Sequence, residues 1–336
     1  MNYLILVIVF ISGFSTIVYQ VVWERLLRIN LGGDHVSSFI VTSVFLLGLG
    51  VGAFIFKGAK RNSVLIYAIL ECLIIGYAFF SYEIFSNGIA LIGSLVDGGM
   101  DLGKHKYLVI ASSMLLLLPP CIFIGASLPL ALDITFKKGI YSVSRIGSVY
   151  GINTIGASIG AIVLPFLFFN HMDFSSTLRF VATVNFLAVI LLLTLFLLRL
   201  KSDVSPSLEA SEPSTLNINK VLGSGSISKP RVSLPVVCFL SFLSGGVALS
   251  AELIFFRFAD INLPASAYNF PIILGLFLLA MGMGSIFFTR LAKKRSYDEV
   301  FLAACLFFGS VLAMLWALWV QSISLGGVRI IEVVLK

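Results

Sequence analysis

Charged side chains are scarce in this sequence of 336 residues. Asp, Glu, Lys and Arg together make up 12% of it, and hydrophobic residues make up 59%. Soluble domains carry about 25% charged residues, so the composition excludes a soluble globular protein. The net charge of +7 comes from basic residues in short clusters at the ends of apolar runs, where they set membrane topology. We therefore expect the lipid bilayer as a partner and no binding of nucleic acid.

Residues that hold metals or cofactors are also few. The four cysteines lie singly in apolar runs without a CxxC pair, and the three histidines are scattered without metal-ligand spacing. The glycine-rich segment DGGMDLG at 97–103 has no strand before it and no room for a βαβ unit, so a plain turn is favoured over a nucleotide site. No pairing of a nucleophile with a base is evident. We predict no catalytic residue, no metal and no cofactor.

Long apolar runs are what the sequence has instead. About 20 apolar residues cross the hydrocarbon core as a helix, and lipid tolerates no unpaired backbone groups. These rules predict an all-α integral membrane protein, a polytopic helical bundle of about nine spans. The spans are expected at 3–27, 36–57, 63–85, 106–136, 145–170, 175–199, 233–258, 266–290 and 298–320. The first span is expected to be retained, because no basic leading segment or small-residue cleavage site marks a signal peptide.

Basic residues follow the second, fourth and eighth predicted spans, in loops that fall on one side of the membrane. By the positive-inside rule this side is the cytoplasm, which places the N-terminus there too. Residues 201–232 shift to Ser, Pro, Gly and charge, which predicts a flexible cytoplasmic linker. The expected division is a six-span bundle at 1–200, the linker, and a second bundle of about three spans at 233–336.

A segment near the start of the sequence is repeated near its end. Residues 10–56 align without a gap with residues 242–288, at a constant offset of 232. The identical pairs include Ser12/Ser244, Gly13/Gly245, Arg25/Arg257, Asn30/Asn262, Gly50/Gly282 and Gly52/Gly284. In so apolar a chain, chance does not also match Gly, Arg and Asn. Six spans separate the starts of the two copies, so both point the same way, as in the parallel halves of major facilitator transporters. The second half, with three spans, is expected to be incomplete.

Polar side chains at membrane depth carry the remaining chemistry, because an ionisable group there is costly and usually functional. The candidate intramembrane polar residues are Gln20, Glu71, Asn153 and Glu252. Gln20 and Glu252 are repeat counterparts, and two roles stay open for them: a buried hydrogen bond between the halves, or a proton or substrate site. The charges of Glu24, Arg25 and Arg257 are expected to line an interface near the outer surface.

Small residues recur in the membrane spans and predict close helix packing. They are Gly50 and Gly52 in the second span, Gly156 and Gly160 in the fifth, and Gly282 and Gly284 in the eighth. A substrate-lining role is the alternative for Asn153 in the fifth span. In the fourth span, Pro119, Pro120 and the segment GASLPL at 125–130 interrupt the hydrogen-bond ladder, which predicts a kinked or locally unwound helix.

Four segments carry a resemblance to a known family. SGFSTIVYQVVWERLL, FLLGLGVGAF, GASLPLAL and YGINTIGASIGAIVLPF occur in this order. They are similar to the membrane region of bacterial proteins that fuse a major-facilitator-like bundle to a spermidine-synthase-like domain. The resemblance implies a module of the bacterial inner membrane that anchors or serves polyamine-type chemistry, without the aminopropyltransferase-like domain. Such a module is expected to work with a separate synthase-like domain or with a second membrane chain.

A function of a different class stays open beside this one. The chain can be a major-facilitator-like secondary transporter of a small solute, cations included, that rocks one half against the other around a midplane site. Fold similarity does not choose between the two hypotheses, because function belongs to sites. Neither hypothesis assigns enzyme activity to this chain on its own.

Overall fold

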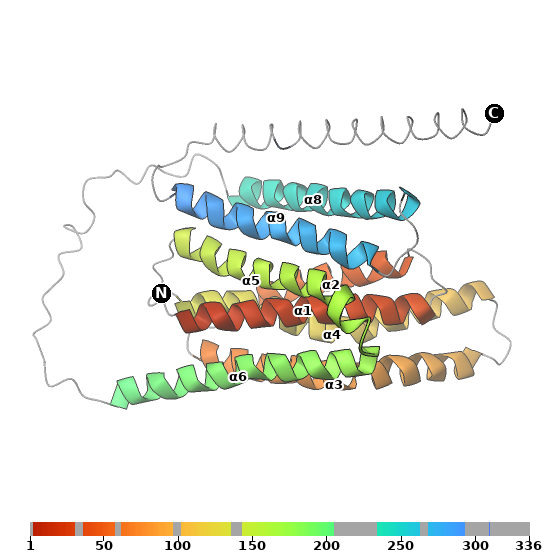
Figure 1. The fold of residues 1–336 in the computed structure, drawn as a ribbon, viewed down its shortest axis with the longest axis horizontal. Helices are drawn as coiled ribbons and strands as arrows, with labels where there is room; N and C mark the ends of the chain where they lie inside the picture. The colour runs from red at the N-terminus through yellow and green to blue at the C-terminus, as the bar shows by residue number, and fades with distance from the viewer. Residues whose placement is uncertain are drawn as a thin grey trace, which may run out of the picture. The chain divides into compact units, whose positions relative to one another are not determined.

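The structure is a computed structural model, and it describes residues 3–30, 36–57, 62–96, 102–135, 143–204, 234–262, 268–292 and 309. Within these ranges the regular elements are helices, and no strand occurs (Figure 1). They are α1 (Tyr3–Asn30), α2 (Val36–Ile55), α3 (Ser63–Val96), α4 (Leu102–Thr135), α5 (Val143–Val163), the π-helical turn η2 (Leu164–Phe168), α6 (Phe174–Val204), α8 (Leu234–Asn262) and α9 (Asn269–Ala292).

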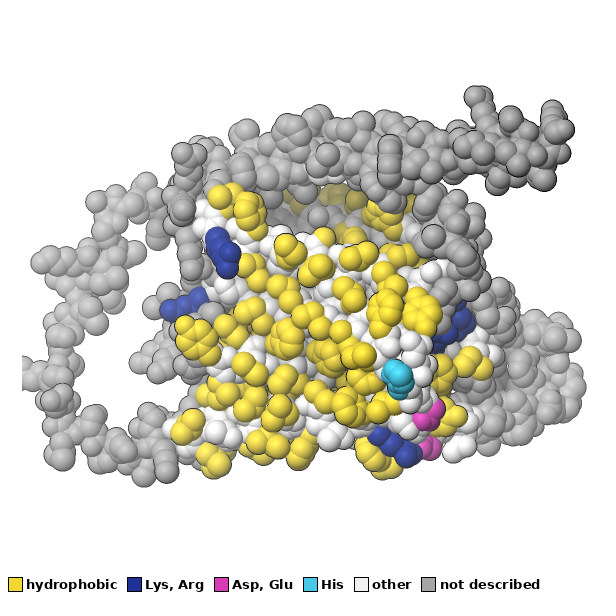
Figure 2. Space-filling view, in the orientation of Figure 1, with side chains coloured by type: hydrophobic (Ala, Val, Ile, Leu, Met, Phe, Trp, Pro, Cys, Tyr) yellow, Lys and Arg dark blue, Asp and Glu magenta, His cyan; other side chains and the backbone are white. Residues whose placement is uncertain are grey.

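Seven of these helices are long and apolar enough to cross a membrane, and α2 adds the shorter apolar segment Ile40–Ile55. The protein is therefore an all-helical, multi-pass membrane protein, as the composition predicts. Figure 2 shows a face covered mostly by apolar side chains, with charged side chains near its edges. Each of the first eight predicted spans overlaps one α-helix, and the fifth also includes η2. The ninth, apart from Gly309, and the linker beyond Val204 lie outside the described residues.

The chain divides into two units, residues Met1–Ile286 and Phe287–Lys336. The described part of the second unit is the end of α9 together with Gly309. The first unit holds α1 to α8 and most of α9. All the packing and polar contacts below belong to this first unit.

α1 and α5 pack with their backbones in close contact, because small residues face the partner helix. A Cβ atom built on Gly13 of α1 would lie under 3.0 Å from the backbone of Asn153 in α5. Gly156 and Gly160 of α5 approach backbone oxygens of α1 equally closely. Larger side chains at these three glycines would push the two helices apart.

α2 and α4 form a second pair of the same kind. A Cβ atom on Gly52 of α2 would meet the carbonyl oxygen of Ile122 in α4, and one on Gly125 of α4 would meet the backbone at Leu49 in α2, each closer than 3.0 Å. The two pairs, α1–α5 and α2–α4, therefore make the most extensive helix contacts described in the first unit.

α4 is one continuous helix although Pro119, Pro120 and Pro129 lie inside it. Of the kink and the local unwinding that the sequence predicts as alternatives, the unwinding does not occur. Pro120 has no N–H group to donate to the carbonyl of Leu116, four residues earlier. The hydroxyl of Tyr77 in α3 donates to that carbonyl at 2.8 Å, so the neighbouring helix satisfies the acceptor that the proline leaves free.

The remaining helices surround these pairs. α3 packs against α4 and α6, and α6 packs against α1. The indole Nε1 of Trp23 in α1 donates to Ser81 of α3 at 3.0 Å. On the other side, α9 is joined to α5, because Ser158 of α5 donates to the carbonyl of Gly275 in α9 at 2.7 Å. α1 thus lies at the centre of the first unit, with α3 and α6 on one side and α5 on another (Figure 1).

Candidate functional site

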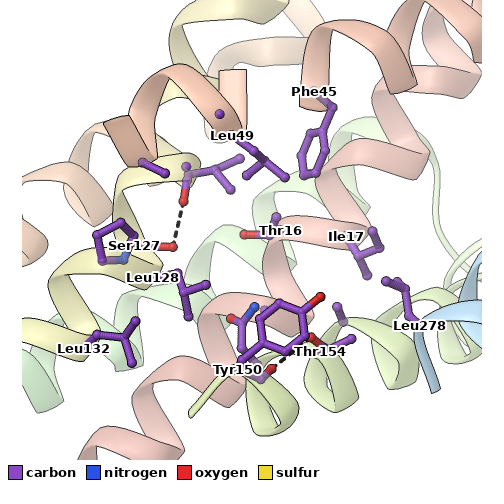
Figure 3. A pocket seen from close by; sticks show the side chains of 18 residues that line it. Thr16, Ile17, Phe45, Leu49, Ser127, Leu128, Leu132, Tyr150, Thr154 and Leu278 are labelled. Carbon is purple, nitrogen blue, oxygen red and sulfur yellow. Dashed lines mark hydrogen bonds between the residues drawn. The ribbon is translucent and has the colours of Figure 1, made fainter. Parts of the chain in front are cut away.

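A cavity of about 500 Å³ lies between the α1–α5 pair and the α2–α4 pair. Its walls come from α1, α2, α4 and α5, and Leu278 of α9 adds to one side (Figure 3). The side chains that line it are mostly apolar, with a few hydroxyl and amide groups among them. They include Thr16, Phe45, Leu49, Tyr150, Asn153 and Thr154. The cavity therefore follows from the way two tight helix pairs meet.

The cavity lies close to the middle of the membrane spans. Thr16 is the central residue of the apolar segment Tyr3–Ile29. On α5, Asn153 stands near the centre of the segment Arg145–Phe168. Because a helix rises about 1.5 Å per residue, both residues are within a few ångströms of the bilayer midplane when these segments span it.

The polar groups of the cavity are neutral. Thr154 Oγ1 donates to the carbonyl of Tyr150 at 2.9 Å, and Ser127 Oγ donates to the carbonyl of Ile124 at 2.7 Å (Figure 3). These two hydroxyls therefore offer lone pairs to the cavity, since their protons are already engaged. No Asp, Glu, Lys or Arg is among the lining residues that the structure describes.

A second polar cluster lies on the other side of α1. The carboxyl group of Glu71 in α3 is buried, with 1% of the residue exposed. Ser12 Oγ of α1 donates to its Oε1 at 2.6 Å, and Asn185 Nδ2 of α6 donates to its Oε2 at 2.8 Å. Ser12 adjoins Gly13, which lines the cavity. α1 is thus the wall that separates the Glu71 cluster from the cavity.

The structure distributes the four predicted intramembrane polar residues over different places. Asn153 lines the cavity, and Glu71 lies in the cluster behind α1. Gln20 is buried in α1, while Glu252 is half-buried in α8. Among the described residues, no hydrogen bond or ion pair joins any two of the four. They therefore do not form one polar site in the described structure.

The charges predicted near the outer surface lie at the C-terminal end of α1. Glu24 is buried and accepts a hydrogen bond from Arg28 Nε at 3.0 Å. The guanidinium carbon of Arg25 lies 4.9 Å from the centroid of the Phe169 ring, a cation–π contact. The side chain of Arg257 lies outside the described part of the chain.

The glycines singled out in the sequence differ in their surroundings. Gly52, Gly156 and Gly160 lie at the helix contacts described above. A Cβ on Gly282 of α9 would lie 3.1 Å from the carbonyl oxygen of Gly151 in α5, whereas a Cβ on Gly50 or Gly284 would meet no described atom within 4 Å. Gly50 instead lines the cavity.

Several residues of both sites were missed in the sequence. For the cavity these are Thr16, Tyr150 and Thr154, which carry no motif and whose hydroxyls are common in membrane helices. For the Glu71 cluster they are Ser12 and Asn185. Two signals were available there: Ser12 belongs to an identical pair of the repeat, and Asn185 is a lone amide in the apolar run VATVNFLAVILLL.

No protein-family model matches the chain, and no curated protein or solved structure matches it either. The similarity to fused bacterial proteins with a spermidine-synthase-like domain therefore stays a prediction from four sequence segments. The cavity and the polar cluster are the features of the described structure that bear on function.

Proposed function

We propose that this protein is a solute-binding membrane bundle of the secondary-transporter kind, and that the cavity between the α1–α5 and α2–α4 pairs is its binding site. The volume and the lining of the cavity are the main support for this proposal. Its volume of about 500 Å³ falls in the range of about 300–1,000 Å³ that is typical of small-molecule sites. Its largely apolar lining with a few convergent polar groups is typical of such sites as well.

The depth of the cavity supports transport over simple anchoring. Secondary transporters bind their substrates near the bilayer midplane, between two parts that rock against each other. The position of Thr16 at the centre of the apolar segment of α1 supports this depth for the cavity. An anchor needs only an apolar exterior, so a central cavity has no role in it.

The lining favours an uncharged solute. Burying a cation in a membrane span is costly unless a carboxylate pairs with it, and the described lining holds none. Thr16, Tyr150 and Asn153 can instead exchange hydrogen bonds with a hydroxyl, carbonyl or amide of the solute. The proposal therefore narrows the transporter hypothesis to small, mainly apolar, neutral molecules. The polyamine role stays a prediction that rests on the sequence resemblance.

The proposal also includes the number of spans, their orientation in the membrane and the internal repeat. We propose nine spans in the bacterial inner membrane, a cytoplasmic N-terminus, and two major-facilitator-like halves related by the repeat. Alkaline phosphatase fused within 201–232 should be inactive and the same enzyme fused near residue 97 active. The reverse pattern would contradict this topology.

A ligand-stability screen tests the binding proposal. Purified protein in detergent is heated in the presence of a panel of neutral amphipathic compounds and, separately, of putrescine and spermidine. We expect stabilisation by some neutral compounds, since a ligand at about 100 times its Kd contributes about 2.7 kcal/mol. We expect none from the polyamines, and stabilisation by the polyamines alone would contradict the neutral-solute proposal.

A matched pair of substitutions on α2 locates the binding site. Ala53 lines the cavity, whereas Ile55 is 59% exposed. Ala53→Phe fills part of the cavity and should abolish the stabilisation by any compound found in the screen. Ile55→Phe introduces the same ring outside the cavity and should leave that stabilisation unchanged. Equal binding by both variants would place the site elsewhere.

A further inference from the structure

Glu71 occupies a closed polar cluster that the proposed cavity does not use. It lies on α3 and receives one donor from each of two other helices, Ser12 from α1 and Asn185 from α6. The hydroxyl of Tyr67, one turn earlier on α3, lies beside it. All four residues are at most 4% exposed. The cluster is therefore built from three helices and sealed from both lipid and the cavity.

No positive charge offsets this carboxyl group in the part of the chain that the structure describes. The titratable groups close enough to interact with it electrostatically are Tyr19 of α1, and Tyr67 and the exposed Cys72 of α3. From α4 and α6 no described titratable group faces it. An isolated carboxylate at membrane depth costs several kcal/mol. The site therefore favours binding of a cation that neutralises the carboxylate.

Two unsatisfied atoms lie next to the carboxyl group. Asn185 Oδ1 and the Tyr19 hydroxyl are both buried, and neither has a hydrogen-bond partner in the described structure. The two side chains are neighbours. A half-turn of the Asn185 amide exchanges its oxygen and nitrogen. Oδ1 then faces Glu71 and can accept a proton from it, while Nδ2 faces the Tyr19 oxygen and can donate to it.

We propose that Glu71 is a proton-binding site of the membrane bundle, in which Asn185 donates to the ionised carboxylate and accepts from the protonated acid. On protonation one proton bonds to Oε2, and the carboxylate becomes a neutral acid. The Asn185 amide rotates, and its Oδ1 accepts the new O–H group. Ser12 keeps its hydrogen bond to Oε1 in both states. The inference is independent of the solute cavity, since none of these residues lines it.

The contact distances favour a proton over a metal ion. Both carboxyl oxygens are already in direct contact with donors, at 2.6 Å and 2.8 Å. A sodium ion would have to displace these donors and recruit several oxygen ligands in their place. A proton requires one acceptor, and the rotated Asn185 amide supplies it.

Infrared titration of the full-length protein in lipid tests this assignment. A protonated buried carboxyl group gives a carbonyl band that an ionised one lacks. We expect this band at neutral pH, where exposed carboxyl groups are ionised, its loss at alkaline pH, and its absence at neutral pH in Glu71→Gln. Glu83→Gln is the matched control on the same helix, because Glu83 pairs with Arg179 at an exposed position, and it should keep the band. Asn185→Leu should shift the band frequency, because the acceptor is removed.

Each alternative outcome overturns the proposal in a distinct way. A protein that shows no such band at neutral pH has an ionised Glu71. A band that survives in Glu71→Gln but is lost when Glu252→Gln is added belongs to Glu252. A band that disappears on addition of sodium at constant pH indicates a metal site. Glutamine imitates the protonated acid, so the proposal also requires Glu71→Gln to fold with wild-type stability, and its failure to fold contradicts the proposal.

Discussion

The two copies of the repeated segment have nearly the same residues at key positions and very different surroundings. In the apolar window of α1, 67% of the residues are buried, whereas in that of α8 6% are. Ser12 donates to Glu71, while its counterpart Ser244 is exposed. Gly13 is in contact with α5, while Gly245 meets no described atom within 4 Å. Burial here depends on which helix lies alongside, since the local sequence is shared.

The largest expected difference between the copies concerns this glycine pair. Gly13→Leu forces a side chain into the backbone of Asn153 and should destabilise the protein by about 3 kcal/mol or more. Gly245→Leu places the same side chain on a helix face that no described atom covers, and it should change stability by less than about 0.5 kcal/mol. Thermal unfolding of both variants in the same detergent measures the contrast. Equal losses would mean that α8 is as closely packed as α1.

The second helix of each repeat copy, α2 and α9, carries two pairs of corresponding glycines, and in each pair a different copy has the packed glycine. Gly52 of α2 faces α4, and its counterpart Gly284 has no described atom near a Cβ. Gly282 of α9 faces α5, and its counterpart Gly50 is open towards the cavity. Alanine at Gly52 should cost about 1–3 kcal/mol by overpacking. Alanine at Gly50 or Gly284 should be neutral or stabilise by about 0.5–1 kcal/mol, because helical glycine is unfavourable. Denaturation midpoints of these three single variants give the order.

The smallest expected difference comes from the serine pair. Ser12→Ala removes one hydrogen bond to Glu71 and should cost about 0.5–1.5 kcal/mol. Ser244→Ala removes a hydroxyl from an exposed position and should stay within about 0.5 kcal/mol of the parent. The same unfolding assay serves for both. If Ser244→Ala costs as much as Ser12→Ala, then Ser244 has a buried partner of its own.

Helix positions were readable from the sequence because the membrane imposes one rule on every span. An apolar run of about 20 residues must satisfy its backbone internally, so the run at residues 3–27 predicts α1 to within a few residues. The interruption expected in α4 shows the limit of this rule. The carbonyl of Leu116, which Pro120 leaves without a helical donor, accepts a hydrogen bond from the hydroxyl of Tyr77. Tyr77 lies 39 residues earlier in the sequence, and no local pattern reveals this contact.

Side-chain contacts between different helices could not be predicted from the sequence, because no local pattern reveals them. Glu71, Asn153, Gln20 and Glu252 look alike in the sequence, as single polar residues in apolar runs. Glu71 gains its role from Asn185, 114 residues away. Asn153 gains its place in the cavity because Gly13 lets α1 and α5 meet there. Which face of a helix meets which neighbour depends on tertiary packing, and one sequence without its relatives does not contain that information explicitly.

The glycine contacts also determine which parts of this membrane protein can move. Larger motions will leave α1 with α5 and α2 with α4, because separating backbones that touch would lose the whole contact at once. Each helix pair would then move as one body, with the cavity between the two pairs. The cavity can then widen or narrow only by movement at the contacts between the two pairs, which include those of α1 with α2 and of α4 with α5.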